Sequence, residues 1–505
     1  MTLRRFISMF VLHVFAPVCL ADGSPPVRIG SKAFTESVIL SEIAVYLAEN
    51  EGHEAKHIEG LGGTRLLWEA LLTGQIDVYP EYTGTMSEEI LAGQIVHGIP
   101  ALRAKLTEFE LKMTDPIGFN NTYVIGMKEK LAAELNIRTI SDLRNHPDLS
   151  LRFSNEFMKR ADGWEALAQR YQLPHRDVRG LEHALAYEAL DRGVIQVTDL
   201  YATDAKIDKL QLRRLQDDRQ HFPQYQAVYV YRADLEKRMP EFVVALHSME
   251  AAIDEAAMTK MNAQVELADL SENRVAADFL AESRGIGVSV REQSVVRDIA
   301  RYTVEHLNMV AVSLTAAMLV AIPLGIVAAR FANVAQPILG VVGVIQTIPS
   351  IALLVLLIRP MSYFSDELGY PQAIAALFLY SLLPIVRNTY TGLKGISPKL
   401  LESGVALGLP PWVRLWRIEL PLASPMILAG IKTAAVINVG FATLGGFIGA
   451  GGFGEPIFTG IRLNDHGVIL QGAVPAAVLA LLVQGLFETA ERVIVPKGLR
   501  LKIGT

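Results

Sequence analysis

Five long apolar segments in the second half of this 505-residue chain constrain its fold more than any other feature. They cover approximately residues 307–329, 337–358, 371–386, 425–450 and 468–483. An α-helix needs about 20 apolar residues to cross a bilayer, and the third segment is short by this measure. Because backbone groups inside a bilayer must bond to one another, residues 305–505 are predicted to form an all-α transmembrane domain with about five spans.

The charged residues are distributed unevenly along the chain. The net charge is −6, yet the residues after His306 include 8 acidic side chains against 13 Lys and Arg. If the preceding part lies outside, five spans place these basic residues on the inner side: Arg330, Arg387, Lys394, Lys399, Arg414, Arg417, Lys497, Arg500 and Lys502. Lys and Arg are enriched in cytoplasmic loops, so the pattern predicts a multi-pass protein of the bacterial cytoplasmic (inner) membrane with a periplasmic N-terminal domain.

The first 21 residues have the layout of a secretory signal peptide. Arg4 and Arg5 precede an apolar stretch that ends at a small-residue site near Ala21. The single cysteine, Cys19, lies in this stretch and lacks the small preceding residue of a lipoprotein signal, so the mature chain is expected to have no disulfide. The alternative is an uncleaved anchor helix.

Residues 26–280 have the pattern of an exported α/β domain. The β-prone runs VRIG, IDVYP, TYVIGM and YQAVYVYR alternate with longer helical patterns. This alternation favours a mainly parallel sheet with helices on its faces, and the length suits two lobes with a cleft between them. Residues 281–304 are expected to form a linker followed by an amphipathic interfacial helix.

The inner loop over residues 400–425 has a pattern suited to docking a partner protein. It is helix-prone up to Leu409, breaks at Pro410 and Pro411, and continues with aromatic residues and arginines. The loop resembles the EAA loop of the permeases of ABC importers. The residues with the matching spacing are Glu402, Ser403, Gly404, Gly408, Ile418, Leu420 and Pro421. That resemblance implies a coupling helix seated on a separate cytoplasmic ABC ATPase subunit, and a permease homodimer.

The energy source is expected to be that partner, because the sequence contains no GxxxxGK[ST] phosphate loop. The chain itself is expected to need no cofactor, since ATP would be bound by the partner subunit. The glycine-rich segment GGFIGAGGFGEPI lacks the Lys-Ser/Thr of a phosphate loop, so it is interpreted as a site of close helix packing.

The resemblance extends over both halves of the chain. The permease half resembles the osmoprotectant-uptake branch of the ABC importers, which implies a type I permease fold. The exported half is similar to binding proteins for glycine betaine, choline and carnitine, which implies a periplasmic-binding-protein-like fold. It contains the motifs SKAFTES, DVYPEYTGT, GFNNTYVIG, NEFMKRADGW, TDLYATDA and HFPQYQAVYV.

The resemblance also implies a set of solute-binding residues. A box of aromatic rings would surround the trimethylammonium group of a quaternary-amine solute, and in this sequence its members would be Tyr82, Tyr123, Tyr201 and Tyr225. A quaternary ammonium has no N–H to donate, so recognition by π faces is physically apt, with about 1–2 kcal/mol for each desolvated contact.

Polar residues at matching motif positions would bind the carboxylate end of a betaine. The resemblance places Lys32, Thr85 and Arg160 there, and an Arg side chain forms two parallel hydrogen bonds with a carboxylate. Asn121 stands where some relatives have Asp, so the cation is expected to depend more on the rings. Trp164 is interpreted either as a further wall of the cleft or as a core residue.

Other classes of protein fit the sequence less well. A ligand-binding receptor or ligand-gated channel also joins a two-lobed domain to membrane helices, but it gives no reason for the EAA spacing. A membrane-tethered enzyme is not supported, because the sequence contains no metal-ligand cluster, nucleophile elbow or Cys-His pairing. A nucleic-acid partner is not expected, since no basic tract is interleaved with aromatic residues.

Overall fold

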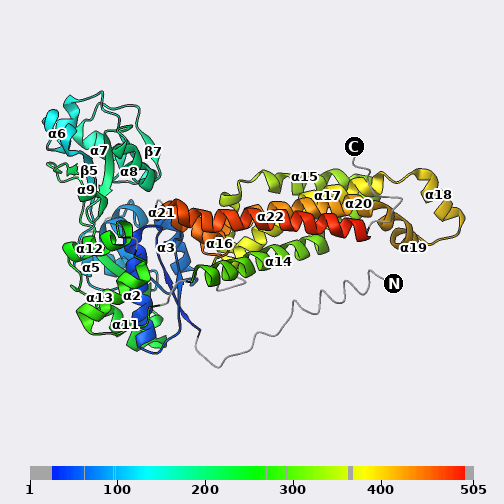
Figure 1. The fold of residues 1–505 in the computed structure, drawn as a ribbon, viewed down its shortest axis with the longest axis horizontal. Coiled ribbons are helices and arrows are strands. Elements are labelled where there is room, and N and C mark those ends of the chain that lie inside the picture. Colours follow the sequence, from blue (N-terminus) through cyan, green and yellow to red (C-terminus); the bar gives the residue numbers. More distant parts are fainter. Residues whose placement is uncertain are drawn as a thin grey trace.

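The computed structural model describes residues 25–494, except 62, 95, 97, 269, 291–293, 362–367 and 464. The predicted signal peptide lies outside these residues. An α/β domain of two lobes stands at one end of the molecule, and a long helical bundle extends from it to the other end (Figure 1). The predicted order, a two-lobed α/β domain before an all-α membrane domain, is confirmed.

Lobe 1 is built on a five-stranded sheet of order β2-β1-β3-β10-β4. Its strands are β1 (Val27–Gly30), β2 (Ala55–Ile58), β3 (Val78–Tyr82), β4 (Leu111–Met113) and β10 (Ala227–Arg232). Strand β1 is parallel to β2 and β3, whereas β10 is antiparallel to β3 and β4. The expectation of a mainly parallel sheet is wrong, because the chain leaves lobe 1 after β4 and returns through β10 in the opposite direction.

The helices of lobe 1 come from both ends of the domain. They are α2 (Thr35–Asn50), α3 (Thr64–Leu72), α4 (Thr83–Thr85), η1 (Met86–Ile90), α5 (Gly98–Thr107), α10 (Leu235–Arg238), α11 (Pro240–His247), α12 (Glu255–Glu266) and α13 (Glu272–Arg284). Helix α2 is buried along most of its length and packs against α11, α12 and α13. Its first turn therefore has a fixed position at the cleft.

Lobe 2 contains an antiparallel sheet of order β8-β5-β9 and a parallel pair β6-β7. Its elements are β5 (Tyr123–Lys128), α6 (Glu129–Glu134), η2 (Ile140–Asn145), β6 (Arg152–Ser154), η3 (Phe157–Lys159), α7 (Trp164–Tyr171), β7 (Arg179–Leu181), α8 (His183–Asp191), β8 (Val197–Tyr201), α9 (Lys206–Lys209) and β9 (Leu212–Arg214). Two strand-like segments cross between the lobes, and they meet where Asn120 bridges to Gln226.

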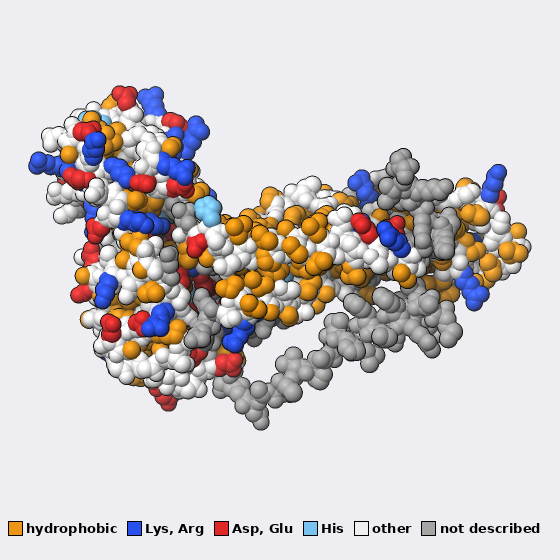
Figure 2. Space-filling view, viewed as in Figure 1, with side chains coloured by type: hydrophobic (Ala, Val, Ile, Leu, Met, Phe, Trp, Pro, Cys, Tyr) orange, Lys and Arg blue, Asp and Glu red, His pale blue; other side chains and the backbone are white. Residues whose placement is uncertain are grey.

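The helical bundle begins with α14 and ends with α22. Its elements are α14 (Val295–Arg330), α15 (Ala332–Thr347), α16 (Ser350–Met361), α17 (Tyr370–Lys394), α18 (Pro398–Ala406), α19 (Pro411–Arg414), η4 (Leu415–Glu419), α20 (Leu420–Ala442), η5 (Thr443–Ile448), α21 (Gly454–Leu463) and α22 (His466–Ile494). Within the described residues, four helices are long and apolar enough to cross a membrane, and the number rises to five if α15 and α16 count as one span. On the face shown in Figure 2, hydrophobic side chains gather on the part of the bundle next to the binding lobes.

The second predicted span is a bent pair of helices. Helices α15 and α16 meet at an angle of 103°. Pro349 lies at the break, and Ile348 before it has the extended conformation that a following proline favours. Proline also removes a backbone donor, so the helix ends here instead of crossing as one rod.

The expected interfacial helix is continuous with the first span. Helix α14 runs without interruption from Val295 to Arg330, since neither Gly nor Pro occurs between Val295 and Pro323. At its centre, the buried Asn438 amide of α20 donates to the hydroxyls of Ser313 (3.2 Å) and Ser381 (2.8 Å), which ties together α14, α17 and α20.

The glycine-rich segment at residues 445–457 packs closely, as the sequence analysis interprets it. A side chain at Gly454 would place its Cβ 1.9 Å from the carbonyl oxygen of Thr443, a distance at which no atom fits. Glycine therefore lets η5 and α21 touch through their backbones, directly beneath the binding domain.

Candidate functional site

Four tyrosines from separate elements meet in the cleft between the lobes. Tyr82 ends β3, Tyr123 begins β5, Tyr201 ends β8, and Tyr225 lies in the crossing segment before β10. Tyr123 and Tyr201 are directly opposed in the antiparallel pair of β5 and β8, with ring centroids 5.3 Å apart. The Tyr225 ring packs edge-on to Tyr123 at 5.6 Å, so three of the predicted rings form one cluster.

Phenylalanine 34 joins the fourth tyrosine to this cluster. The Phe34 ring lies 6.2 Å from Tyr82 and 5.7 Å from Tyr201, measured between centroids. Phe34 directly precedes α2, and the sequence analysis did not single it out, although it belongs to the SKAFTES motif. The aromatic box therefore has contributions from both lobes and from the crossing segment.

Local sequence holds Tyr225 in place. The Asn120 side chain accepts from the Tyr225 backbone N–H at 2.6 Å, and the Asn121 N–H donates to the Tyr225 carbonyl at 3.0 Å. A Cβ at Gly84 would lie 2.7 Å from the Tyr225 ring. The glycine of the YTGT motif is thus required for the ring to pack against α4.

Two cationic side chains lie over these rings. The Arg160 guanidinium carbon is 5.1 Å from the Tyr123 ring centroid and 5.4 Å from that of Tyr225. The Lys32 ammonium is 5.5 Å from the centroid of Tyr82. These distances are within the range of cation–π attraction, so the rings present faces that bind positive charge.

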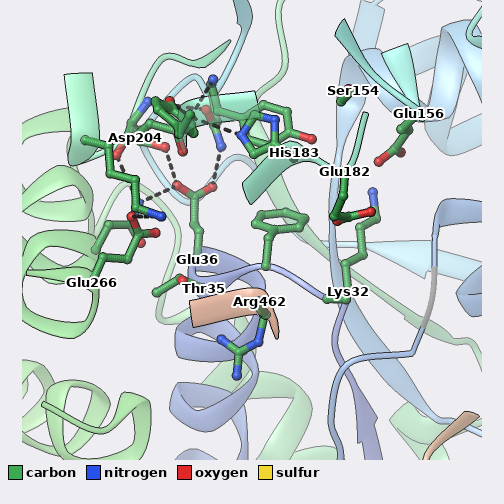
Figure 3. Close-up of a pocket in the computed structure, with 18 of the residues that line it drawn as sticks. Lys32, Thr35, Glu36, Ser154, Glu156, Glu182, His183, Asp204, Glu266 and Arg462 are labelled. Carbon is green, nitrogen blue, oxygen red and sulfur yellow. Dashed lines mark hydrogen bonds and ion pairs between the residues drawn. The ribbon is translucent and has the colours of Figure 1, made fainter. Parts of the chain in front are cut away.

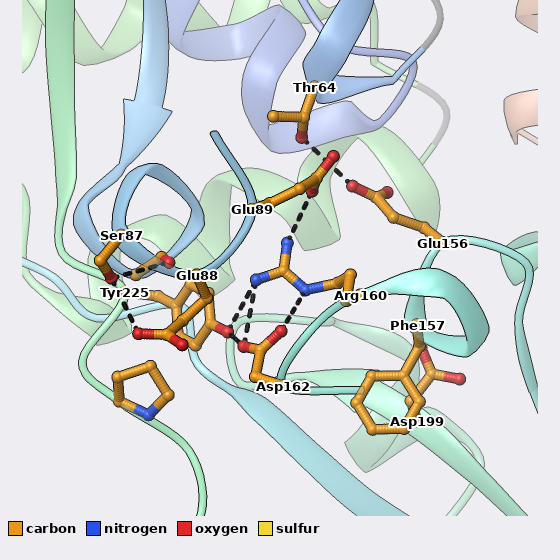
Figure 4. Close-up of polar contacts among 12 residues, drawn as sticks. Thr64, Ser87, Glu88, Glu89, Glu156, Phe157, Arg160, Asp162, Asp199 and Tyr225 are labelled. Atoms are coloured by element: carbon orange, nitrogen blue, oxygen red, sulfur yellow. Dashed lines mark hydrogen bonds and ion pairs between the residues drawn. The ribbon is translucent and has the colours of Figure 1, made fainter. Parts of the chain in front are cut away.

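Arg160 also forms a dense set of polar contacts (Figure 4). Its Nε and Nη2 donate to the two oxygens of Asp162 at 2.8 and 3.1 Å, and Nη2 donates to the Tyr225 hydroxyl at 2.9 Å. Its Nη1 donates to Glu89 at 3.0 Å, which joins lobe 2 to lobe 1. Burial, followed by the neighbouring charge of Glu156, raises the pKa of Glu89. The predicted carboxylate-binding arginine is therefore paired with the protein's own carboxylates here.

The other two predicted carboxylate ligands come from lobe 1. Lys32 donates to Glu81 at 2.6 Å in a pair that is almost fully buried. Thr85 is buried at the end of α4. Both lie on the lobe 1 side of the cleft, across from the elements that position Tyr123 and Tyr201.

A buried carboxylate, Glu36, organises the inner end of the cleft (Figure 3). Its Oε1 accepts from the Tyr82 hydroxyl at 2.5 Å and from the Asn121 amide at 2.9 Å. Its Oε2 accepts from the Thr203 hydroxyl at 2.5 Å and from the Asn262 amide at 3.3 Å. Burial raises the pKa of Glu36 to about 7, although these four hydrogen bonds act to lower it.

The sequence analysis missed Glu36, and one signal was present. Glu36 lies in SKAFTES, a motif that the sequence analysis used for Lys32 alone. An acidic residue in the first turn of a helix is usually exposed, and only the fold shows that it is 2% exposed. Its bond to Asn121 also brings a carboxylate beside the neutral amide of a predicted site residue.

A cavity of about 290 Å³ adjoins these residues and reaches the bundle. Of the predicted site residues, Lys32, Asn121 and Tyr201 line it, together with Phe34 and Glu36. Two lining residues come from the membrane domain: Phe447 and Arg462. Trp164 does not line it; its ring stacks on Phe153 at 5.1 Å in the core of lobe 2, which answers the open question of its place.

The predicted coupling residues lie at the end of the bundle farthest from the binding lobes (Figure 1). Glu402, Ser403 and Gly404 belong to α18, Gly408 forms the turn after it with φ +70°, and Pro421 lies in the first turn of α20. Large apolar side chains are exposed around this turn: Leu400, Val405, Leu407, Trp412 and Trp416. Beneath them Glu419 is buried between Arg330 (2.7 Å) and Arg414 (3.0 Å).

A two-lobed domain with an aromatic cleft is joined in one chain to membrane-length helices, and the family matches identify this architecture as the membrane subunit of a binding-protein-dependent transporter. Residues 25–282, just over half of the chain, match the model of the substrate binding domain of ABC-type glycine betaine transport systems. Residues 321–497 match the binding-protein-dependent transport system inner membrane component. The chain belongs to this family: it is an ABC importer subunit with a type I permease domain and its own periplasmic-binding-protein fold, and it is not an enzyme.

Similar proteins cover each half separately. The choline transport system permease protein of Bacillus subtilis is 44% identical over 198 residues, which are 39% of this chain and 89% of that protein. The osmoprotectant import permease protein of Salmonella typhimurium is 40% identical over 202 residues, 40% of this chain and 94% of that protein. A solved glycine betaine/carnitine/choline ABC transporter structure is 26% identical, with a TM-score of 0.45, and covers 52% of this chain and 99% of that chain.

Proposed function

We propose that this chain captures a quaternary-ammonium or betaine solute on the periplasmic side of the bacterial inner membrane and forms its path in ATP-driven import. The single observation that supports this most is the cluster of Tyr123, Tyr201 and Tyr225, whose rings come from two strands of lobe 2 and from the crossing segment. A cation without N–H donors is recognised by such faces and by shape. The names of the similar permeases agree with this solute class.

The site residues implied by the sequence divide by role. The rings of Tyr82, Tyr123, Tyr201 and Tyr225 bind the trimethylammonium group. The donors Lys32, Thr85 and Arg160 bind a carboxylate, which replaces Glu89 among the partners of Arg160. Asn121 positions the cation through its bond to Glu36.

A separate ATPase drives the transport through the loop at residues 400–425. Exposed apolar side chains around α18 and α19 give a partner a surface to cover, at the end of the bundle that holds Arg330 and Lys394. These basic ends support a cytoplasmic position for the loop and a periplasmic one for the binding domain. Two copies of the permease and two ATPase subunits complete the importer, with residues 26–280 as the binding domain and 305–505 as the permease.

Titration and transport test this proposal together. The purified full-length chain is titrated by calorimetry against glycine betaine, choline, carnitine and ergothioneine. At least one of these solutes is expected to bind, and uptake of that solute into vesicles should require ATP and the ATPase subunit. If none of the four binds, the solute class is wrong. Binding without ATP-dependent uptake would favour the receptor alternative.

A further inference from the structure

One arginine of the membrane domain is buried against the binding domain. Arg462 lies near the end of α21, a short helix outside the candidate spans that packs between the bundle and the lobes (Figure 1). Its Nη2 donates to Glu59 at 2.7 Å and its Nη1 to Glu272 at 2.5 Å. The Arg462 side chain is 7% exposed.

The two carboxylates come from different elements of lobe 1. Glu59 directly follows β2 and Glu272 begins α13. Two carboxylates held near each other repel, and a buried guanidinium without partners is strongly unfavourable. Each domain therefore supplies the charge that the other needs, and the triad is satisfied only when the domains are docked.

Apolar packing continues the same junction. Ile358 and Leu368 of the membrane domain belong to one buried cluster with Ile58 and Leu67 of lobe 1. On the neighbouring face, Leu66 of lobe 1 packs against a buried cluster of the bundle. Lobe 1 and the membrane domain therefore share a core, whereas lobe 2 meets the membrane domain through α8 and α21.

We propose that Arg462, Glu59 and Glu272 form an interdomain clamp that fixes lobe 1 on the outer face of the permease, so that the cleft opens by movement of lobe 2. Arg462 also lines the cavity between the cleft and the bundle, where it appears among the residues drawn in Figure 3. With lobe 1 fixed, the mouth of the cleft stays above the permease in every state. This inference concerns docking and goes beyond the proposed solute class.

Charge reversal tests the clamp through transport. In Arg462→Glu, three carboxylates meet at the junction, and uptake in vesicles, measured at a solute concentration that saturates each variant, is expected to fall at least about tenfold. The double variant Arg462→Glu with Glu59→Arg again places one arginine beside two carboxylates and should restore most of the uptake. Arg359→Gln is the matched control, because its 3.8 Å contact with Glu69 crosses the same junction but is exposed. Its uptake should equal that of the parent.

Distances measured between spin labels test the clamp without a transport assay. In a Cys19→Ser background, one label at His466 is combined with a second at Val244 of lobe 1 or Val194 of lobe 2, both exposed. The distance from His466 to Val244 should be narrow and should broaden in Arg462→Glu. The distance from His466 to Val194 should change when solute is added.

Three outcomes overturn the clamp. They are parental uptake in Arg462→Glu, a double variant no better than the single one, and an unchanged distance distribution to Val244 in Arg462→Glu. Failure of the parent to bind any tested solute is a different result: it contradicts the proposed function and leaves the distance measurement to decide on the clamp.

Discussion

The two halves of the chain hold their buried polar groups in different ways. In the binding half, charged side chains pair across the cleft, as Arg160 does with Glu89. In the proposed function, such a pair exchanges one partner for a solute carboxylate. In the permease half, the neutral amide of Asn438 ties together Ser313 and Ser381 at the centre of three helices. The first arrangement permits exchange and the second fixes helix packing, so substitutions should affect binding and transport separately.

The largest effect is expected at the far end of the permease. Gly408 has φ +70°, and among the described residues no atom lies within 4 Å of the position of a Cβ, so Gly408→Asp causes no clash with them. A charged side chain there obstructs the docked ATPase. ATP-dependent uptake and solute-stimulated ATP hydrolysis in vesicles should be abolished, with solute affinity unchanged.

Gly193→Asp provides the matched control for this experiment. Gly193 also has positive φ (+71°) and open space around it, but it lies in lobe 2. Its variant carries the same backbone strain and should transport normally. If the Gly408 variant inserts correctly and transports at the parental rate, the loop is not the coupling element. The expectation that substitutions affect binding and transport separately is then wrong.

A smaller effect is expected at the exchangeable pair. Arg160→Ala should weaken glycine betaine binding by about 3 kcal/mol, roughly 100-fold, because the solute carboxylate loses its guanidinium. Choline has no carboxylate, and the Asp162 and Glu89 charges left behind favour a cation, so its affinity should change far less. Calorimetry on the full chain measures both, with Arg179→Ala, an exposed lobe 2 arginine, as the control. Equal losses for the two solutes would mean that Arg160 only shapes the cleft.

Substitutions of the aromatic rings in the cleft should have the next largest effect on solute affinity. Tyr123→Ala should weaken binding of either solute by about 1–3 kcal/mol, whereas Tyr123→Phe keeps the ring face and should cost much less. Tyr225→Phe should be intermediate, since its hydroxyl contacts both Arg160 and Asp162. Full affinity in Tyr123→Ala would place the aromatic cage elsewhere.

The smallest effect concerns pH. Folded Glu36 has a pKa of about 7 against 4.5 when exposed, so the folded chain keeps a proton there that the unfolded chain releases. The free energy of unfolding should therefore fall as pH rises from about 4.5 to 7. A bound cation favours the carboxylate; if it lowers this pKa by one unit, choline affinity rises about fivefold between pH 6 and 8.

Glu36→Gln removes both trends if Glu36 causes them. Glutamine keeps the shape of the side chain and has no titratable group. Affinity and melting temperature are measured over the same pH range for both chains. A parent slope that persists in the variant would assign the titration to another group of the cavity, such as Asp204, Glu266 or His183.

The sequence predicted the order of elements well because local patterns determine it. The runs VRIG, IDVYP, TYVIGM and YQAVYVYR contain or overlap β1, β3, β5 and β10, and the four tyrosines lie at the ends of strands or beside them. The contacts of Arg160 with Glu89 and of Arg462 with Glu59 were not predicted. Their residues lie 71 and 403 positions apart, respectively, so no local pattern in the sequence indicates that they meet. The bend at Pro349 had a local signal in the sequence, because proline interrupts the apolar run. The prediction of a single span used only the length of that run and did not take the proline into account.

The covalent joining of the two domains has a kinetic consequence. Only the ten residues between Arg284 and Val295 separate α13 from α14, and a short tether of this kind holds a binding domain at an effective concentration in the millimolar range. An importer made from this chain has no free pool of receptor that must diffuse to the membrane. At a fixed ATP concentration, its uptake rate should depend on the concentration of solute and not on that of a separate receptor, and an excess of soluble, solute-free binding domain should not compete with it.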